Sequence, residues 1–322
     1  MSQIRTLTIL SYNAWMLDAP FKLGALDVKA RAAAIPKSLC ETGADVIALQ
    51  EVWSSRHKKF FADEFKKLGY EYSFYENAPF NWLLRRLFGN GLLIVSKVPL
   101  VKSNLRHERV MAFSHYTRRD EYFAGKGALF VNLQVTPETT ISFYNTHLGA
   151  VSMNPKTGRV DLSHEQARQN QAVELFKFIK ETHKENPIIV VGDFNTHYKI
   201  FSEDGLSHSY APDHQNLTAF PYSEKGMALI DSFHSIHGEF SEKYTHNTEK
   251  NLYGDHRPVY RFRAPNRTLD YIYVSRNEDL EICHSEIVLT ENILIPGRAK
   301  PLPLSDHFGI LTRIKLLASQ TF

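Results

Sequence analysis

The chain has 322 residues, 43% of them hydrophobic and 12% aromatic, and a formal net charge of +3. This composition provides for a sizeable hydrophobic core and excludes a long disordered protein. Lys and Arg are scattered among acidic residues, which argues against a dedicated nucleic-acid binder with its concentrated basic face.

Apolar runs bounded by polar or turn residues predict strands along the chain, at 6–12, 44–51, 90–96, 127–135, 140–147, 187–193, 268–275, 281–289 and 308–316. Amphipathic periodicity predicts helices between them, at 28–41, 55–68 and about 164–183. In the last helix Val173, Phe176 and Ile179 are expected to face inward. The segment 198–264 has only weak periodicity. This succession predicts a layered α/β or α+β fold of mixed sheets with helices outside.

The two cysteines, Cys40 and Cys283, lie far apart and outside any metal-binding pair, so buried free thiols are expected rather than a bridge. The first 17 residues lack the apolar core and cleavage site of a secretory signal. No stretch approaches the length of an apolar membrane span. We expect a soluble monomer made in the cytoplasm, with peripheral membrane contact or non-classical export left open.

Polar side chains stand at or beside the ends of many predicted strands. They are Asn13, Glu51, His147, Asp193, Asn195, Asp270, Asp306 and His307. Any one of them could serve a turn, because Asp and Asn are common turn formers. Their repetition on separate segments is instead typical of an active site assembled from strand ends.

The chemistry of this set points to a phosphate ester. A few carboxylates and amides without cysteine ligands suit Mg²⁺, with Mn²⁺ as a substitute. A histidine held by a carboxylate can take a proton from water near neutral pH, and a second histidine can protonate the leaving oxygen. Amides can donate hydrogen bonds to phosphoryl oxygens. The set predicts metal-dependent hydrolysis by water without a covalent intermediate.

The motifs SYNAW, DVIALQEVW, NTHL, GDFNT, LDYIYV and LSDH, in this order, resemble those of the endonuclease/exonuclease/phosphatase superfamily, which includes DNase I. Within it the chain most resembles the neutral sphingomyelinases, through LQEVW, GLLIVSK, FAGKG, THLGA and PLSDH. The resemblance implies a single catalytic domain over 1–322 with a DNase I-like, four-layer α-β-β-α sandwich of two packed mixed β-sheets. It also implies hydrolysis of sphingomyelin to ceramide and phosphocholine.

On the metal side, the resemblance implies that Glu51 is the principal Mg²⁺ ligand, with Asn13 beside it and Asp306 as a neighbouring acid. Asn195 would hold the scissile phosphate, and His147 would stabilise the phosphoryl charge or donate to the leaving alkoxide.

For proton transfer, the resemblance implies that His307 is the general base and that Asp270 orients it. Asp193 would position or help to activate the attacking water. Coupled groups titrate together, so the sequence leaves open which of Asp193 and His307 takes the proton.

Other residues carry alternatives. Lys126 is a surface lysine at a strand start, a phosphate contact, or a switch paired with Glu121 or Asp120. We expect loop roles outside the site for a further set of histidines: His197, His208, His214, His246 and His256. A nuclease, a lysophospholipid phosphodiesterase or an inositol-phosphate phosphatase are alternative activities, the last with 256–267 as its basic cluster. DNA is disfavoured because the charge supplies no basic groove.

The segment 79–88, PFNWLLRRLF, predicts a membrane contact because it combines an apolar, aromatic face with Arg85 and Arg86 on the other side. The predicted contact residues are Phe80, Trp82, Leu83, Leu84, Leu87 and Phe88. The alternative is a short buried helix with one charged edge.

We predict that combining Trp82→Ala with Leu84→Ser lowers liposome binding and activity on vesicles, because it removes apolar surface from the lipid-facing side. Activity on detergent-dispersed substrate should survive. Equal losses on both substrates, with a lower melting temperature, would identify the segment as core.

Overall fold

The computed structural model describes most of the chain, namely residues 5–18, 24–76, 89–101, 109–116, 124–150, 162–183, 185–197, 199–201, 208–210, 229–238, 241, 243–253, 266–276, 279–295 and 297–317. The predicted membrane-contact segment 79–88 lies outside the described residues, as do Asp120, Glu121 and most of 256–267.

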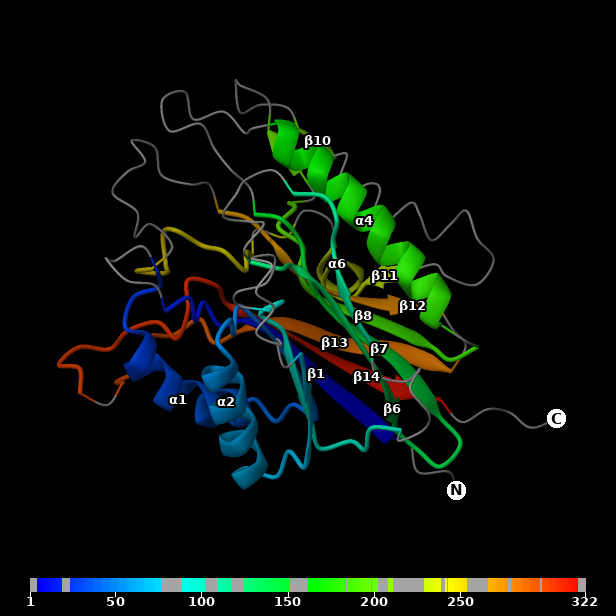
Figure 1. Cartoon of the computed structure of the whole chain (residues 1–322), viewed down its shortest axis with the longest axis horizontal. Helices are drawn as coiled ribbons and strands as arrows, with labels where there is room; N and C mark the ends of the chain where they lie inside the picture. Colours follow the sequence, from blue (N-terminus) through cyan, green and yellow to red (C-terminus); the bar gives the residue numbers. More distant parts are fainter. Residues whose placement is uncertain are drawn as a thin grey trace, which may run out of the picture.

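Two six-stranded mixed β-sheets form the centre of the molecule (Figure 1). The first has the order β13 (Leu280–Val288), β14 (Gly309–Leu316), β1 (Arg5–Asn13), β2 (Val46–Gln50), β4 (Leu93–Ser96) and β3 (Tyr72–Tyr75). The second has the order β11 (Leu229–Asp231), β12 (Asp270–Ser275), β8 (Ile188–Asp193), β7 (Thr140–His147), β6 (Gly127–Gln134) and β5 (Arg109–Ala112). A separate hairpin pairs β9 (Lys199–Phe201) with β10 (His208–Tyr210).

Alternation of side chains along the strands builds the layers. In β1, Leu7 and Ile9 join the core between the sheets, whereas Leu10 and Tyr12 face α1 (Val28–Cys40) and α2 (Ser55–Lys67). In β6, Leu129 likewise points to the core between the sheets, and Phe130 joins the cluster under α4 (Leu162–Thr182). Helices therefore cover the outer faces, and the predicted α-β-β-α sandwich is confirmed (Figure 1).

The sequence analysis did not predict several short elements, namely β3, β5, β9, β10, β11 and the six-residue α6 (Ser232–His237). Three or four residues carry too little periodicity to stand out. In α4 the buried stripe includes Phe176 and Ile179 as expected, but Val173 is 51% exposed, because the stripe runs through Ala172 instead. Among the described helices, none is both long enough and apolar enough to cross a lipid bilayer.

The cysteines are free, as expected, but they are not both buried. Cys40 is half-buried and Cys283 is exposed. Cys283 lies on β13, an edge strand whose residues alternate between more and less exposed positions. The expectation of two buried thiols is therefore wrong for Cys283.

Lys58 is a buried cation on the inner side of α2. Its side chain is fully buried, and its Nζ donates to the Glu76 carbonyl at 3.3 Å. Burial lowers the pKa of Lys58 to about 8, although the Glu76 carboxylate partly opposes the shift. Between pH 8 and the ordinary lysine pKa of 10.5 the folded chain has released this proton and the unfolded chain still holds it. The unfolding free energy therefore rises with pH across this window.

We predict that Lys58→Met, which removes the charge and keeps an unbranched chain, abolishes this rise. The variant's stability relative to the parent should fall by about 2 to 3 kcal/mol between pH 7 and pH 10. Urea unfolding at both pH values measures it. Lys66→Met, at an exposed position on the same helix, is the control, and its unfolding free energy should change with pH as that of the parent does. A stability difference between Lys58→Met and the parent that is the same at both pH values would contradict the prediction.

Candidate active site

Strand register brings three predicted site residues together at one edge of the second sheet. His147 ends β7 and pairs with Asp193 in the parallel β7–β8 ladder. Asp193 in turn pairs with Asp270 in the antiparallel β8–β12 ladder. All three side chains are at most 1% exposed. Residues far apart in sequence thus form one row across three hydrogen-bonded strands.

Asn13 connects this row to the first sheet. Its Nδ2 donates to Asp193 Oδ2 at 2.8 Å and to Glu51 Oε1 at 3.2 Å. Its Oδ1 accepts the Trp15 N–H at 3.0 Å, which fixes the orientation of the amide. Asn13 therefore presents its nitrogen, not its oxygen, to both carboxylates.

Beneath Asn13 a second pair of amides joins the sheets. Gln50 Nε2, at the end of β2, donates to Asn145 Oδ1 of β7 at 2.8 Å. Asn145 Nδ2 donates to the carbonyls of Leu49 and Leu93 at 3.0 and 3.2 Å. The sheets are thus cross-linked by hydrogen bonds directly below the site.

His307, from the loop before β14, lies between two carboxylates. Its Nδ1 is 2.8 Å from Asp270 Oδ2, and its Nε2 is 4.0 Å from Asp193 Oδ2. Burial lowers the pKa of His307, but Asp270, through its charge and hydrogen bond, together with Asp193 and Asp306, outweighs burial and raises it well above the usual value.

The Asp193 carboxylate is the centre of the cluster. Burial and repulsion from Asp270 raise its pKa to about 7, although His307 and Lys126 oppose the shift. His147 Nε2 lies 3.4 Å from Asp193 Oδ2. Burial, with repulsion from Lys126 and His307, lowers the pKa of His147 well below its usual value. The pKa values of the two histidines are therefore shifted in opposite directions.

Asn195 and Lys126 converge on one carbonyl. Asn195 Nδ2 and Lys126 Nζ each donate to the Leu148 carbonyl at 3.0 Å. Asn195 has a left-handed φ of 52°, and its N–H donates to Asp193 Oδ1 at 2.9 Å. Lys126 is 4% exposed, so its reading as a surface lysine is wrong.

Glu51 and Asp306 form the partly exposed side of the cluster. Burial and repulsion from Asp306 raise the pKa of Glu51, while Lys126, Asn13 and His307 oppose the shift. Donor atoms of Glu51, His147 and Asp193 lie within 4.8 Å of one another. The repulsion between the Glu51 and Asp306 carboxylates, together with this donor set, fits a divalent cation.

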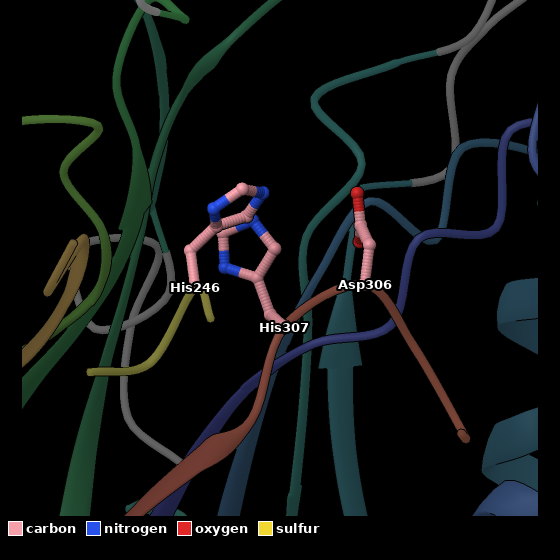
Figure 2. A group of neighbouring side chains, drawn as sticks. All are labelled: His246, Asp306 and His307. Carbon is pink, nitrogen blue, oxygen red and sulfur yellow. The ribbon is translucent and has the colours of Figure 1, made fainter. Parts of the chain in front are cut away.

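His246 also lies at the site, contrary to expectation. Its ring centroid is 5.3 Å from that of His307, and donor atoms of His246, Asp306 and His307 lie within 4.8 Å of one another. Figure 2 shows the His246 ring next to the His307 ring at a steep angle, with Asp306 projecting from the same loop as His307. An isolated β-bridge to Arg267 positions His246, and such a bridge leaves no periodic signal in the sequence. Of the other four histidines, His197 accepts the Thr268 N–H; His208 lies on β10, and His214 and His256 lie outside the described residues.

Two helix-flanked mixed sheets with an acid–base cluster at one shared edge define a DNase I-like fold. Residues 10–307 match the sequence model of the Endonuclease/Exonuclease/phosphatase family, and the chain belongs to this family.

Known relatives extend the likeness along nearly the whole chain. A Caenorhabditis elegans protein named "Putative neutral sphingomyelinase" is 26% identical over 97% of this chain and 67% of its own length. An inositol phosphosphingolipids phospholipase C of Schizosaccharomyces pombe is 25% identical over 96% of this chain and 68% of its own length. The chain therefore spans about two thirds of these relatives. A beta toxin from Staphylococcus aureus superposes with a TM-score of 0.67 at 18% identity, over 95% of this chain and 99% of that one.

Proposed function

We propose that this chain is a Mg²⁺-dependent phosphodiesterase that hydrolyses sphingomyelin to ceramide and phosphocholine. The observation that carries the proposal is His307 held by Asp270 at 2.8 Å while its other nitrogen faces Asp193. This arrangement suits proton transfer from a water molecule. The names of the worm and fission-yeast relatives, both of which refer to sphingolipids, support the choice of lipid.

In this mechanism Asp270 accepts the Nδ1–H of His307 and so directs Nε2 toward the attacking water. Asp193 holds the same water from the other side, and the proton is shared within the Asp193–His307 pair, since the pKa of each is raised. Water attacks phosphorus in line with the ceramide oxygen. As the bond from the water oxygen to phosphorus forms, the bond from phosphorus to the ceramide oxygen breaks, and the proton of the water passes to the Asp193–His307 pair. The departing alkoxide takes its proton from solvent.

The remaining residues act on the phosphoryl group and its leaving oxygen. His147 is neutral, so it has one N–H to offer to a phosphoryl oxygen or to the leaving alkoxide. Asn195 and Lys126, anchored on Leu148, hold the phosphoryl oxygens as negative charge develops.

Glu51 and Asp306 would hold the cation, and Asn13 would orient Glu51 through its amide N–H. When bound there, Mg²⁺ supplies positive charge that offsets the two carboxylates and polarises the phosphoryl oxygen. The lipid would be reached at a membrane surface by peripheral contact.

The substrate test compares sphingomyelin, an inositol phosphosphingolipid, a lysophospholipid and DNA with Mg²⁺ and with EDTA. We expect Mg²⁺-dependent release of phosphocholine from sphingomyelin, and a sharp loss in Glu51→Gln, because the amide cannot supply the ligand charge. Glu41→Gln, at an exposed position at the end of α1, is the control. DNA cleavage with inert sphingomyelin, or full activity in EDTA, would contradict the proposal.

We expect His307→Ala to lower kcat by about 10²- to 10⁴-fold, the usual contribution of a general base. Steady-state kinetics on detergent-dispersed substrate measures it, with the more exposed His284→Ala as the control. Asp270→Asn should shift the acid limb of the pH profile to lower pH, because Asp270 raises the pKa of His307. A His307→Ala enzyme within a few-fold of the parent would show that the base lies elsewhere.

A further inference from the structure

Arg267 is a cation beside the site for which the mechanism above has no use. It precedes Asp270 by three residues, and its backbone N–H and carbonyl pair with those of His246 at 2.9 Å each. Through His246, whose ring contacts that of His307, Arg267 is fixed next to the acid–base cluster. Its position is therefore set by the same elements that set the site.

The side chain of Arg267 has an unsatisfied hydrogen-bond donor. Its Nε is shielded from solvent and has no hydrogen-bond partner in the described part of the chain. Asp193 attracts the guanidinium, but the Asp193 oxygens already accept from the Asn195 N–H and from Asn13. A shielded guanidinium without a bonded anion is costly, so the folded chain favours an anion at this place.

A second arginine, Arg168, lies near enough to Arg267 for their charges to repel. Arg168, on α4, is 3% exposed, and its Nη1 is 3.5 Å from the Ala150 carbonyl. Burial and repulsion from Arg168 lower the pKa of Arg267 to about 10, so Arg267 remains protonated at neutral pH. An anion placed between Arg168 and Arg267 would therefore be attracted by both guanidinium groups.

Lys126 extends the basic group along the same stretch of chain. Its Nζ contacts the Leu148 carbonyl at 3.0 Å, two residues before the carbonyl that Arg168 contacts. Leu148 and Ala150 directly follow the site residue His147. Lys126 lies just before β6, Arg168 on α4 and Arg267 in the chain before β12. The charges of Lys126 and Arg267 both interact with Asp193, and that of Arg168 interacts with Arg267.

We propose that Arg168 and Arg267, together with Lys126, form an anion-binding subsite that takes a phosphate oxyanion. A guanidinium offers paired donors that match phosphate oxygens, and a released phosphomonoester carries more negative charge than the diester from which it comes. The oxyanion is therefore that of the lipid phosphodiester or of the phosphomonoester product. The identity of the biological ligand rests on the proposed phosphodiesterase activity. The binding of an oxyanion at this place does not.

The test titrates inorganic phosphate into the full chain in EDTA and follows binding by calorimetry. We expect saturable binding that Arg267→Gln weakens about tenfold or more, the effect of losing a charge-assisted hydrogen bond. Arg267→Lys should be intermediate, because it keeps the charge and loses the paired donors. Arg313→Gln, at an exposed position of β14, is the matched control and should bind like the parent.

Thermal unfolding accompanies the titration. Because Arg267→Gln removes an unpaired charge, its melting temperature should equal or exceed that of the parent. Arg168→Gln is a second variant from a different element and should also weaken phosphate binding. Equal phosphate affinity in the parent and both glutamine variants, or no saturable binding by the parent, would overturn the subsite.

Two further measurements distinguish the sources of the oxyanion. A higher inhibition constant for phosphocholine in Arg267→Gln, at unchanged KM for vesicles, identifies the product as the ligand. A higher KM identifies the lipid phosphodiester. If the chain binds phosphate through Arg267 but hydrolyses no lipid, the subsite stands and the proposed function is refuted. If the chain hydrolyses lipid but binds phosphate independently of Arg267, the proposed function stands and the subsite is refuted.

Discussion

The register between β7 and β8 is the constraint on which the site depends. Side chains in a strand alternate with a period of two, so a slip of one residue would turn Asp193 away from His147 and Asp270. Gly192 fixes this register, because a Cβ at its position would stand 2.0 Å from the Thr146 carbonyl oxygen, and its φ of 149° suits glycine alone. The close backbone contact that only Gly192 permits therefore places the carboxylate that follows it.

The short segment GDFN shows how turn formation and chemistry coincide. Gly192 allows the close approach of β7, Asp193 gathers its neighbours, and Asn195 adopts a left-handed conformation in which its N–H caps Asp193. These residue types are the ones that turns favour, and here the turn holds candidate site residues at fixed positions. The same residues therefore form both the turn and the candidate site.

The sequence could predict what regular strands determine. The ends of β7, β8 and β12 were recognisable because long apolar runs mark buried strands, and polar residues at their ends stand out. His246 could not be found, since an isolated bridge gives it a position without a repeating pattern. The burial of Lys126 was equally hidden, because it follows from contacts with Leu148 across the sheet rather than from its neighbours in sequence. Electrostatic effects such as the opposite shifts of the two histidines need the three-dimensional arrangement of all the charges.

The hydrogen bond from Asn13 to Asp193 makes the geometry of the site depend on the distance between the two sheets. The two residues belong to different sheets, and the Gln50–Asn145 pair spans the same interval just below them. Protein interiors are close-packed, so the distance between the sheets is set by the apolar residues that fill the space between them. The hydrogen-bond distances in the site therefore change when the spacing between the sheets changes. A substitution deep between the layers, without contact to any polar residue, would therefore change the distances among Asn13, Glu51 and Asp193 while the fold persists.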